Sequence, residues 1–198
     1  MTIAFSYADE TRKTIGVIMA LPSTIYRVNI QLSDIDQGVY EQLQTTVARH
    51  PSETEERLVA RLLAYVLFYG EQLLFTKGIS VGEEPDLWVK GADGRVLLWI
   101  EVGLPDAERL IKASRHAAQV ALIASGRTLP NWEQQQFPKL QNIPNLSVIC
   151  FDQVFINSLA SKLDRSINWS VTINDGNLYM NVGNETFETI IRQRVGRR

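Results

Sequence analysis

The sequence predicts a mixed α/β fold, and three patterns support this class. Residues 24–32 alternate polar and apolar side chains, which is typical of a strand with one solvent-exposed face. Residues 84–103 place two β-rich runs on either side of Asp93-Gly94, a dipeptide that favours a tight hairpin turn. The order strand, helix, strand across 96–124 is typical of a parallel crossover. We therefore expect a mixed sheet flanked by helices, with further antiparallel strands near both ends of the chain.

The composition excludes several classes of protein. The 198 residues are 45% apolar and 21% charged, with a net charge of −2 and a pI near 5.8. This mildly acidic balance argues against non-specific binding of nucleic acid. No apolar run reaches the roughly 18 residues of a membrane span, and the single Cys150 excludes an intramolecular disulfide. We expect a cytoplasmic protein with no membrane association.

The chain is expected to form one domain. Residues 1–22 have the character of an irregular extension, while 23–198 contain no linker, repeat or low-complexity stretch. Within this domain, strand 24–32 is followed by 39–49, which we interpret as a second strand paired with the first. A helix over 39–48 is the competing interpretation.

The strongest helix start in the chain lies between His50 and Glu55. Ser52 is predicted to be the N-cap, and Glu55 three residues later completes a capping box. Glu53 and Glu55 would then complement the helix dipole in the first turn. Capping explains Glu56 less well, since that residue borders the apolar stripe of the helix.

Helices and strands alternate after the hairpin. Asp106 is expected to begin a helix that runs to about His116, and the basic residues from Arg192 to the C-terminus are interpreted as a frayed tail. The other expected elements are a strand over 117–124, a short helix within 126–145, a strand over 146–151, a helix over 152–162 capped by Asp152, and a hairpin of strands 169–173 and 178–182.

The predicted hairpin brings two carboxylates together. If residues 93–94 form a two-residue turn, counting outward pairs Trp88 with Trp99 and Asp86 with Glu101. Opposite residues have Cβ atoms about 4.5–5.5 Å apart, so the two acids would lie side by side. The tryptophan pair is interpreted as core packing, with base stacking as the alternative.

Facing carboxylates of this kind could bind a hard cation. Mg²⁺ and Mn²⁺ prefer oxygen ligands, and either ion can activate water and stabilise charge on phosphorus. A third acid, Glu56, and a cation on the following helix, Lys112 or Arg109, would complete a phosphodiester-cleaving site. His50 is a candidate supporting donor, and packing against the strand end is its alternative role.

Four blocks of the sequence also match a known family in residues and in order. They are RHPSETEER at 49–57, EPD at 84–86, WIEVGLPD at 99–106 and the pair Arg109-x-x-Lys112. Together they resemble the YaeQ family over about residues 22–182. That bacterial family has no settled biochemical activity, and its fold is regarded as a variant of the PD-(D/E)xK nuclease fold.

The resemblance implies a metal site. In that nuclease superfamily a helix Glu, a strand Asp and an E-x-K pair surround a divalent ion. The matching residues here are Glu56, or Glu53, on the helix, Asp86 on the first strand and Glu101 on the second. The implied cofactor is Mg²⁺ or Mn²⁺.

The motif departs from the superfamily at position 103, where glycine replaces lysine. Alternation along the strand would place residue 103 on the same face as Glu101. The lysine would then have migrated to Lys112, with Arg109 as the next candidate, or catalysis would have been lost.

Two functions remain open on this basis. The first is a metal-dependent phosphodiesterase acting on DNA or RNA. The second is a non-catalytic regulatory protein that binds nucleic acid or a protein partner, with its acids held by Arg57, Arg109 or Lys112 as buried ion pairs. Acids that converge on an open cleft would support the first function, and acids fully paired and closed off from solvent would support the second.

Overall fold

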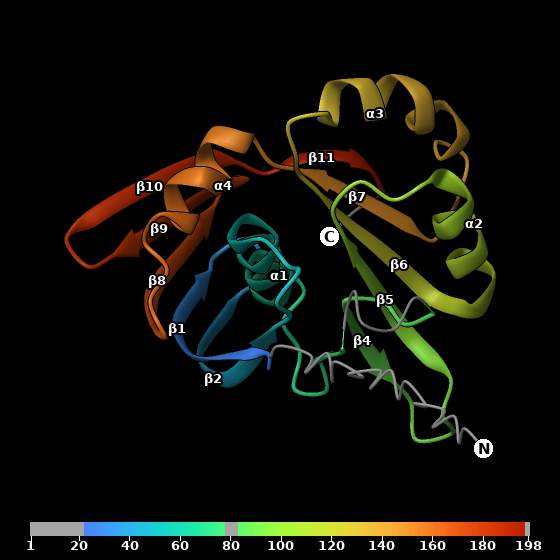
Figure 1. Ribbon diagram of the computed structural model, residues 1–198. Helices are drawn as coiled ribbons and strands as arrows, with labels where there is room; N and C mark the ends of the chain where they lie inside the picture. The colour runs from blue at the N-terminus through green and yellow to red at the C-terminus, as the bar shows by residue number, and fades with distance from the viewer. Residues whose placement is uncertain (1–21, 78–82, 197–198) are drawn as a thin grey trace, which may run out of the picture.

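The computed structural model describes residues 22–77 and 83–196 (Figure 1). The extension expected over 1–22 therefore lies outside the described residues, apart from Pro22. The described chain forms a mixed α/β fold with two mixed sheets and helices on their faces. None of the helices in these two ranges is long and apolar enough to cross a membrane.

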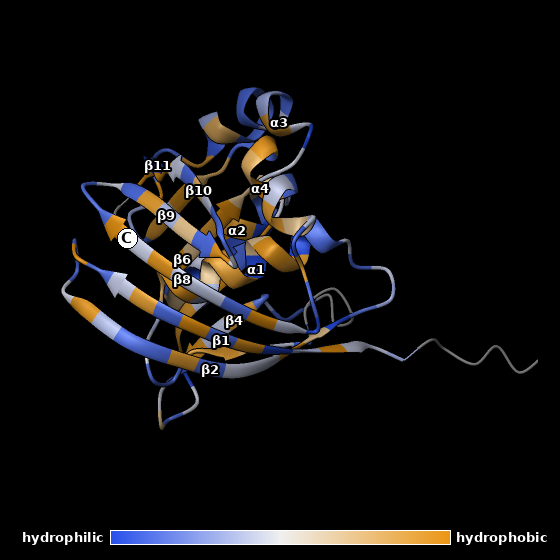
Figure 2. Ribbon diagram, turned by 90° about the vertical axis from the view of Figure 1, so that its left-hand side faces the viewer, coloured by the Kyte–Doolittle hydropathy of each residue, from blue (hydrophilic) through white to orange (hydrophobic). Residues whose placement is uncertain are grey.

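The first sheet joins the two ends of the domain. Its strand order is β10–β9–β8–β1–β2, and β1 is parallel to β8 while all other neighbours are antiparallel. Figure 2 shows this sheet from its outer face, with the described helices behind it. The strands are β1 (Thr24–Asp34), β2 (Val39–Arg49), β8 (Ser166–Asn174), β9 (Asn177–Val182) and β10 (Glu185–Ile190).

The second sheet carries the predicted hairpin. Its strand order is β11–β7–β6–β5–β4–β3, with β5, β6 and β7 parallel to one another and the outer strands antiparallel. The strands are β3 (Leu74–Phe75), β4 (Leu87–Lys90), β5 (Val96–Val102), β6 (Ala117–Ala124), β7 (Leu146–Cys150) and β11 (Arg192–Val195).

The interior consists of two cores, one on each face of the second sheet. Helix α1 (Glu55–Leu67) and helix α4 (Gln153–Ala160) lie between the sheets, and the central core joins them to residues of both sheets. Helix α2 (Ala107–His116) and helix α3 (Leu129–Gln136) cover the other face of the second sheet and enclose the outer core. A 3₁₀ turn, η2 (Phe137–Lys139), follows α3.

Most of the predicted elements are confirmed. Residues 39–49 form a strand paired antiparallel with β1, which excludes the helical alternative. The predicted strand over 117–124 has the bounds of β6, and α2 begins after Asp106 and ends at His116. The two apolar faces of β5 contact the two cores, as expected for a strand between layers.

The start of α1 was predicted wrongly. The N-cap is Thr54, whose Oγ1 accepts a hydrogen bond from the Arg57 N–H at 3.2 Å, and the helix begins at Glu55. Ser52 instead contacts the His50 ring, with 2.7 Å between Oγ and Nδ1. Glu53 is not an exposed residue of the first turn, because its side chain is buried and ion-paired.

The hairpin has the predicted tryptophan pair but a different turn. Trp88 lies opposite Trp99. A three-residue loop replaces the two-residue turn, since the Gly91 N–H donates to the Arg95 carbonyl at 2.8 Å. Leu97 has no partner on β4, and this bulge restores the expected register further along the strands.

The C-terminal segment is a strand rather than a frayed tail. Strand β11 pairs antiparallel with β7. Arg192 lies 2.9 Å from a carboxylate oxygen of Asp152, and Arg194 lies 3.2 Å from Glu133. The basic side chains therefore tie the segment to helices α3 and α4.

Candidate functional site

The two predicted strand carboxylates lie at one end of the hairpin, buried in the protein. Asp86 precedes β4 and is 1% exposed, while Glu101 lies in β5 and is 5% exposed. The Asp86 N–H donates to the Ile100 carbonyl at 2.9 Å, and its Oδ2 accepts from the Val102 N–H at 2.8 Å. The Asp86 carboxylate is therefore held by the backbone of β5.

Two arginines of α1 occupy the same site. Arg57 Nη2 lies 2.7 Å from Asp86 Oδ1, and Arg61 Nε lies 3.8 Å from the same oxygen. Both guanidinium groups also contact Glu53, each through Nη1 at 3.1 Å. We call these four residues, Glu53, Arg57, Arg61 and Asp86, the arginine cluster.

Sequence reasoning missed Arg61. Its side chain is 2% exposed, donates to the Ala48 carbonyl at 3.1 Å, and has its Cζ 5.3 Å from the centre of the Phe75 ring. A fully buried arginine is rare unless it is paired. The signal was a positive charge inside an otherwise apolar helix, four residues after Arg57 and eight after Glu53.

Glu101 has a separate set of partners on the α2 side of the sheet. Its Oε1 accepts a hydrogen bond from Trp99 Nε1 at 2.7 Å and lies 2.8 Å from Arg109 Nε. Arg109 also donates to the Glu84 carbonyl at 2.8 Å. Of the two cations considered for this acid, Arg109 therefore contacts it, while Lys112 is exposed on α2.

Two other candidates contribute less than predicted. Glu56 is half-buried and lines a cleft beside the helix start rather than joining the arginine cluster. The ring of His50 bonds Ser52, and it is the backbone N–H of His50 that reaches Glu53 Oε2, at 3.3 Å.

Burial governs the ionisation of both strand acids. It raises the pKa of Asp86 above its ordinary value, against the opposing influence of Arg57 and Arg61. It also raises the pKa of Glu101, against the opposing influence of Arg109. The nearby charge of Asp86 adds to the second shift, but the two carboxylates do not lie side by side as predicted, because Asp86 contacts α1 and Glu101 contacts α2.

The arrangement of these acids does not fit a divalent ion. Both oxygens of Glu53 accept from arginine, those of Asp86 accept from Arg57 and Val102, and Oε1 of Glu101 accepts from Trp99 and Arg109. A metal ion would have to displace these donors. Within residues 22–77 and 83–196, no group of three or more His, Cys, Asp or Glu residues is placed to hold one.

Gly103 has a conformational reason for being glycine. Its φ is +106°, a backbone region that L-residues rarely adopt, and an added Cβ would meet no atom within 4 Å. Strand β5 ends at Val102, so the alternation that would carry residue 103 to the Glu101 face stops there. A lysine at this position would strain the backbone before it could reach any carboxylate.

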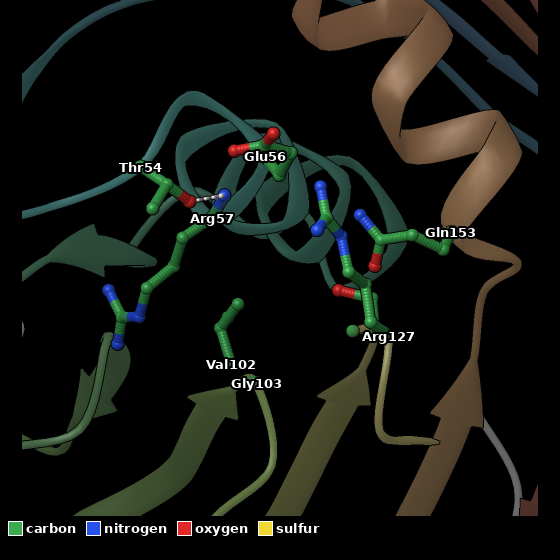
Figure 3. Close-up of a pocket in the computed structure, with 9 residues that line it drawn as sticks. Thr54, Glu56, Arg57, Val102, Gly103, Arg127 and Gln153 are labelled. Atoms are coloured by element: carbon green, nitrogen blue, oxygen red, sulfur yellow. Dashed lines mark hydrogen bonds between the residues drawn. The ribbon is translucent and has the colours of Figure 1, made fainter. Parts of the chain in front are cut away.

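A cleft of about 320 Å³ opens where β5 and β6 end and α1 and α4 begin. Figure 3 shows Arg57 on one side, Arg127 and Gln153 on the other, and Val102 and Gly103 between them. Ligands of α/β proteins commonly bind at the carboxyl ends of parallel strands. We call this the β5–β6 cleft; its lining residues are Thr54, Glu56, Arg57, Val102, Gly103, Ser125, Gly126, Arg127 and Gln153.

The charged groups of the β5–β6 cleft favour an anion. Arg57 is partly exposed there although it is also bound to Asp86. Arg127 is exposed, and no ion pair involves it among the described residues. A guanidinium group presents a fork of donors that matches the oxygens of a phosphate. Glu56 is the one acidic residue among those lining the cleft.

Comparison with known proteins gives consistent matches over almost the whole chain. The sequence model of the YaeQ protein family matches residues 19–191. An uncharacterised YaeQ protein of Salmonella typhi is 38% identical over 171 residues, which cover 86% of this chain and 94% of that protein. The uncharacterised YaeQ protein of Escherichia coli K12 is 38% identical over 163 residues, covering 82% and 90%.

Two solved structures share the fold. The crystal structure of a YaeQ protein from Pseudomonas syringae is 42% identical and superimposes with a TM-score of 0.84, covering 88% of this chain and 97% of that one. The crystal structure of a YaeQ protein from Xanthomonas axonopodis pv. citri is 34% identical, with a TM-score of 0.85 and coverages of 88% and 99%.

Proposed function

The chain belongs to the YaeQ family, and we propose that it keeps a nuclease-like arrangement of strands and helices but binds a nucleic-acid backbone without cutting it. The contact of Asp86 with Arg57 and that of Glu101 with Arg109 carry this proposal. Acids that are closed off and fully paired with guanidinium groups are what a binding protein, rather than a metal-dependent phosphodiesterase, would have.

The β5–β6 cleft is the proposed contact with the backbone. Arg127 supplies an exposed guanidinium, and Arg57 is held in place by Glu53 and Asp86. In this proposal the buried acids orient Arg57 rather than coordinate an ion. Phosphate contacts of this kind supply affinity but no sequence preference, and because the chain as a whole is mildly acidic, they would be confined to this cleft rather than spread over a basic surface.

Fluorescence anisotropy with labelled single- and double-stranded DNA and RNA tests the binding. Replacing Arg127 with Gln should weaken binding several-fold and reduce the slope of log K against log salt by about one, because one phosphate contact is lost. The matched control is Arg95→Gln, which alters an exposed arginine beside the hairpin loop, at the opposite end of β5 from the cleft. Equal affinity for Arg127→Gln and wild type would refute the cleft as the binding site.

Cleavage assays test the absence of catalysis. Incubation with the same nucleic acids and Mn²⁺ should release no more product from wild type than from Asp86→Asn. Cleavage that Asp86→Asn abolishes would overturn the proposal and restore the phosphodiesterase.

The cofactor expectation has its own test. Calorimetric titration with Mg²⁺ or Mn²⁺ should give no stoichiometric binding, because Arg57 and Arg109 would have to leave Asp86 and Glu101 first. Stoichiometric binding that disappears in both Asp86→Asn and Glu101→Gln would support the metal-dependent alternative instead.

A further inference from the structure

Strand β2 is a long edge strand with few of the features that usually prevent an edge strand from pairing with another chain. It forms one margin of the five-stranded sheet, visible at the lower edge of that sheet in Figure 2. Its 11 residues pair with β1 without a register shift, and they include neither proline nor lysine. Proteins normally protect outer strands with such residues or with a bulge, because an open edge can pair with another strand.

The hydrogen-bond pattern of β1 shows which peptide groups of β2 face outward. The Arg27 N–H donates to the Arg165 carbonyl at 2.8 Å, so odd-numbered residues of β1 bond to β8. Even-numbered residues of β1 therefore bond to β2, and the pairing of Val28 with Thr45 makes their partners odd-numbered. The even-numbered residues of β2 point away from the sheet.

One of these outward groups already has a partner inside the protein. The Ala48 carbonyl accepts from Arg61 Nη1 at 3.1 Å. The peptide groups of the other four residues have no hydrogen-bond partner in the described part of the chain. They belong to Tyr40, Gln42, Gln44 and Thr46.

These four residues match a second copy of themselves in one register. With Leu43 on a two-fold axis, Tyr40 pairs with Thr46 of the second copy and Gln42 pairs with Gln44. Each such pair exchanges two hydrogen bonds. A shift of two residues in either direction would pair Tyr40 with Ala48, whose carbonyl is occupied, or Thr46 with Gly38 in the turn.

The side chains are compatible with this register. Leu43 would face Leu43 of the second copy, and Val39 would face Val47, all on the side of the central core. Glu41 would face the neutral Thr45. No like charges lie directly opposite one another, which is the arrangement that destabilises strand pairs.

We propose that the protein forms a two-fold symmetric dimer through antiparallel pairing of its β2 edges, which joins two five-stranded sheets into one continuous sheet. Closed two-fold contacts use the same surface on both copies. Pairing through an added strand also takes its affinity from main-chain hydrogen bonds. This proposal is independent of the function assigned to the β5–β6 cleft.

A pair of double variants tests both the dimer and its register in the full chain. Gln42 and Gln44 are exposed and would face each other across the axis. Gln42→Lys with Gln44→Lys places lysine opposite lysine twice. Gln42→Lys with Gln44→Glu places lysine opposite glutamate twice. Both variants lose the same exposed hydrogen bond from Gln42 to Asn29, so they differ only in the sign of one charge.

Sedimentation velocity over a wide range of protein concentrations is the measurement. Wild type should be a dimer, and the dimer dissociation constant of the double-lysine variant should be at least about tenfold higher. The lysine–glutamate variant should remain dimeric. A wild type that stays monomeric overturns the proposal. Dissociation of the lysine–glutamate variant also overturns it, since a shift of register in either direction places the two introduced glutamates, or the two introduced lysines, opposite each other. If neither variant changes the dimer dissociation constant, the interface lies elsewhere and the proposal is overturned as well.

Discussion

Arg57 and Arg61 limit the chemistry available to Asp86, because their guanidinium groups occupy the place beside its carboxylate that a metal ion or a proton-donating side chain would otherwise take. Arginine remains protonated throughout the physiological range, so neither residue can exchange a proton as a lysine can. The same holds for Arg109 beside Glu101. The acids therefore act as counter-ions that fix the positions of three arginines.

Restoring the motif lysine should not restore a nuclease site. Gly103→Lys should lower the free energy of unfolding by about 1–3 kcal/mol, because φ at this position is +106°. Gly103→Ala is the matched control and should cost about the same, since the space around the Cβ position is empty and the strain lies in the backbone. Urea unfolding measures both. A Gly103→Lys protein as stable as wild type that cleaves DNA with Mn²⁺ would contradict this view.

The raised pKa values of Asp86 and Glu101 predict a specific pH dependence of stability. The folded state binds these protons more tightly than the unfolded state does, so the stability that the two groups contribute is present at low pH and is lost as pH rises through their folded pKa values. The variant Asp86→Asn with Glu101→Gln stays neutral. Its lost bond from the Val102 N–H adds only a constant difference.

Urea unfolding at a series of pH values measures this dependence. The unfolding free energy of wild type minus that of the double variant should fall as pH rises from the ordinary carboxyl values, 3.8 for Asp and 4.5 for Glu, and then level off. A difference that grows with pH would mean that Arg57, Arg61 and Arg109 outweigh burial.

At the scale of elements, the start of α1 can be tested by two single substitutions. Thr54→Ala should lower the free energy of unfolding by about 1 kcal/mol, because it removes the cap to the Arg57 N–H. Ser52→Ala, the matched control, should change it by less than about 0.5 kcal/mol, since that residue is exposed and caps nothing. Chemical unfolding of both variants is the measurement, and the reverse order would return the N-cap to Ser52.

The sequence was informative where one segment carries its own pattern. The apolar run of β6 and the helix start at Asp106 were placed within a residue, because burial and capping are local. The N-cap at Ser52 was misplaced because the capping-box spacing fits this serine, with Glu55 three residues later, whereas the observed N-cap, Thr54, has Arg57 in that place.

The candidate site was predicted only in part, for a related reason. The hairpin register placed Asp86 and Glu101 near the same end of the strand pair, but it also predicted that they lie side by side, whereas Asp86 contacts α1 and Glu101 contacts α2. The pairing of Asp86 with Arg61 could not be predicted. Arg61 lies within a helix whose residues Leu58–Leu67 are all buried, and no periodic pattern distinguishes a paired arginine from an exposed one. The β5–β6 cleft combines residues of α1, β5, α4 and the loop that follows β6, a grouping that exists only after folding.

At the scale of the whole molecule, pairing between distant segments determines the architecture. Strand β1 lies parallel to β8, more than a hundred residues away in the chain, and α1 fills the space that this pairing encloses. The sequence predicted antiparallel strands near both ends of the chain but not that β1 and β8 pair with each other, because parallel pairing produces no distinctive residue pattern in either strand. The expectation of one domain over 23–198 thus becomes a question of whether the two cores unfold together.

A buried leucine of α1 can answer that question. Leu62 is fully buried in the central core, and Leu62→Ala should lower the free energy of unfolding by about 2–5 kcal/mol. Two single-tryptophan proteins report on the two cores separately: Trp169 lies in the central core and Trp132 in the outer core. In each, the other tryptophans are replaced by phenylalanine.

If the domain is one cooperative unit, Leu62→Ala shifts both fluorescence transitions to the same lower urea concentration, because β5 and β6 contribute residues to both cores and neither core can unfold without exposing the other. Leu97→Ala is the control, since Leu97 is 43% exposed and should shift both transitions little. A Trp132 transition that stays in place while the Trp169 transition moves would divide the chain into two units. Because β5 and β6 contribute to both cores, the boundary between the two units would then lie within the second sheet.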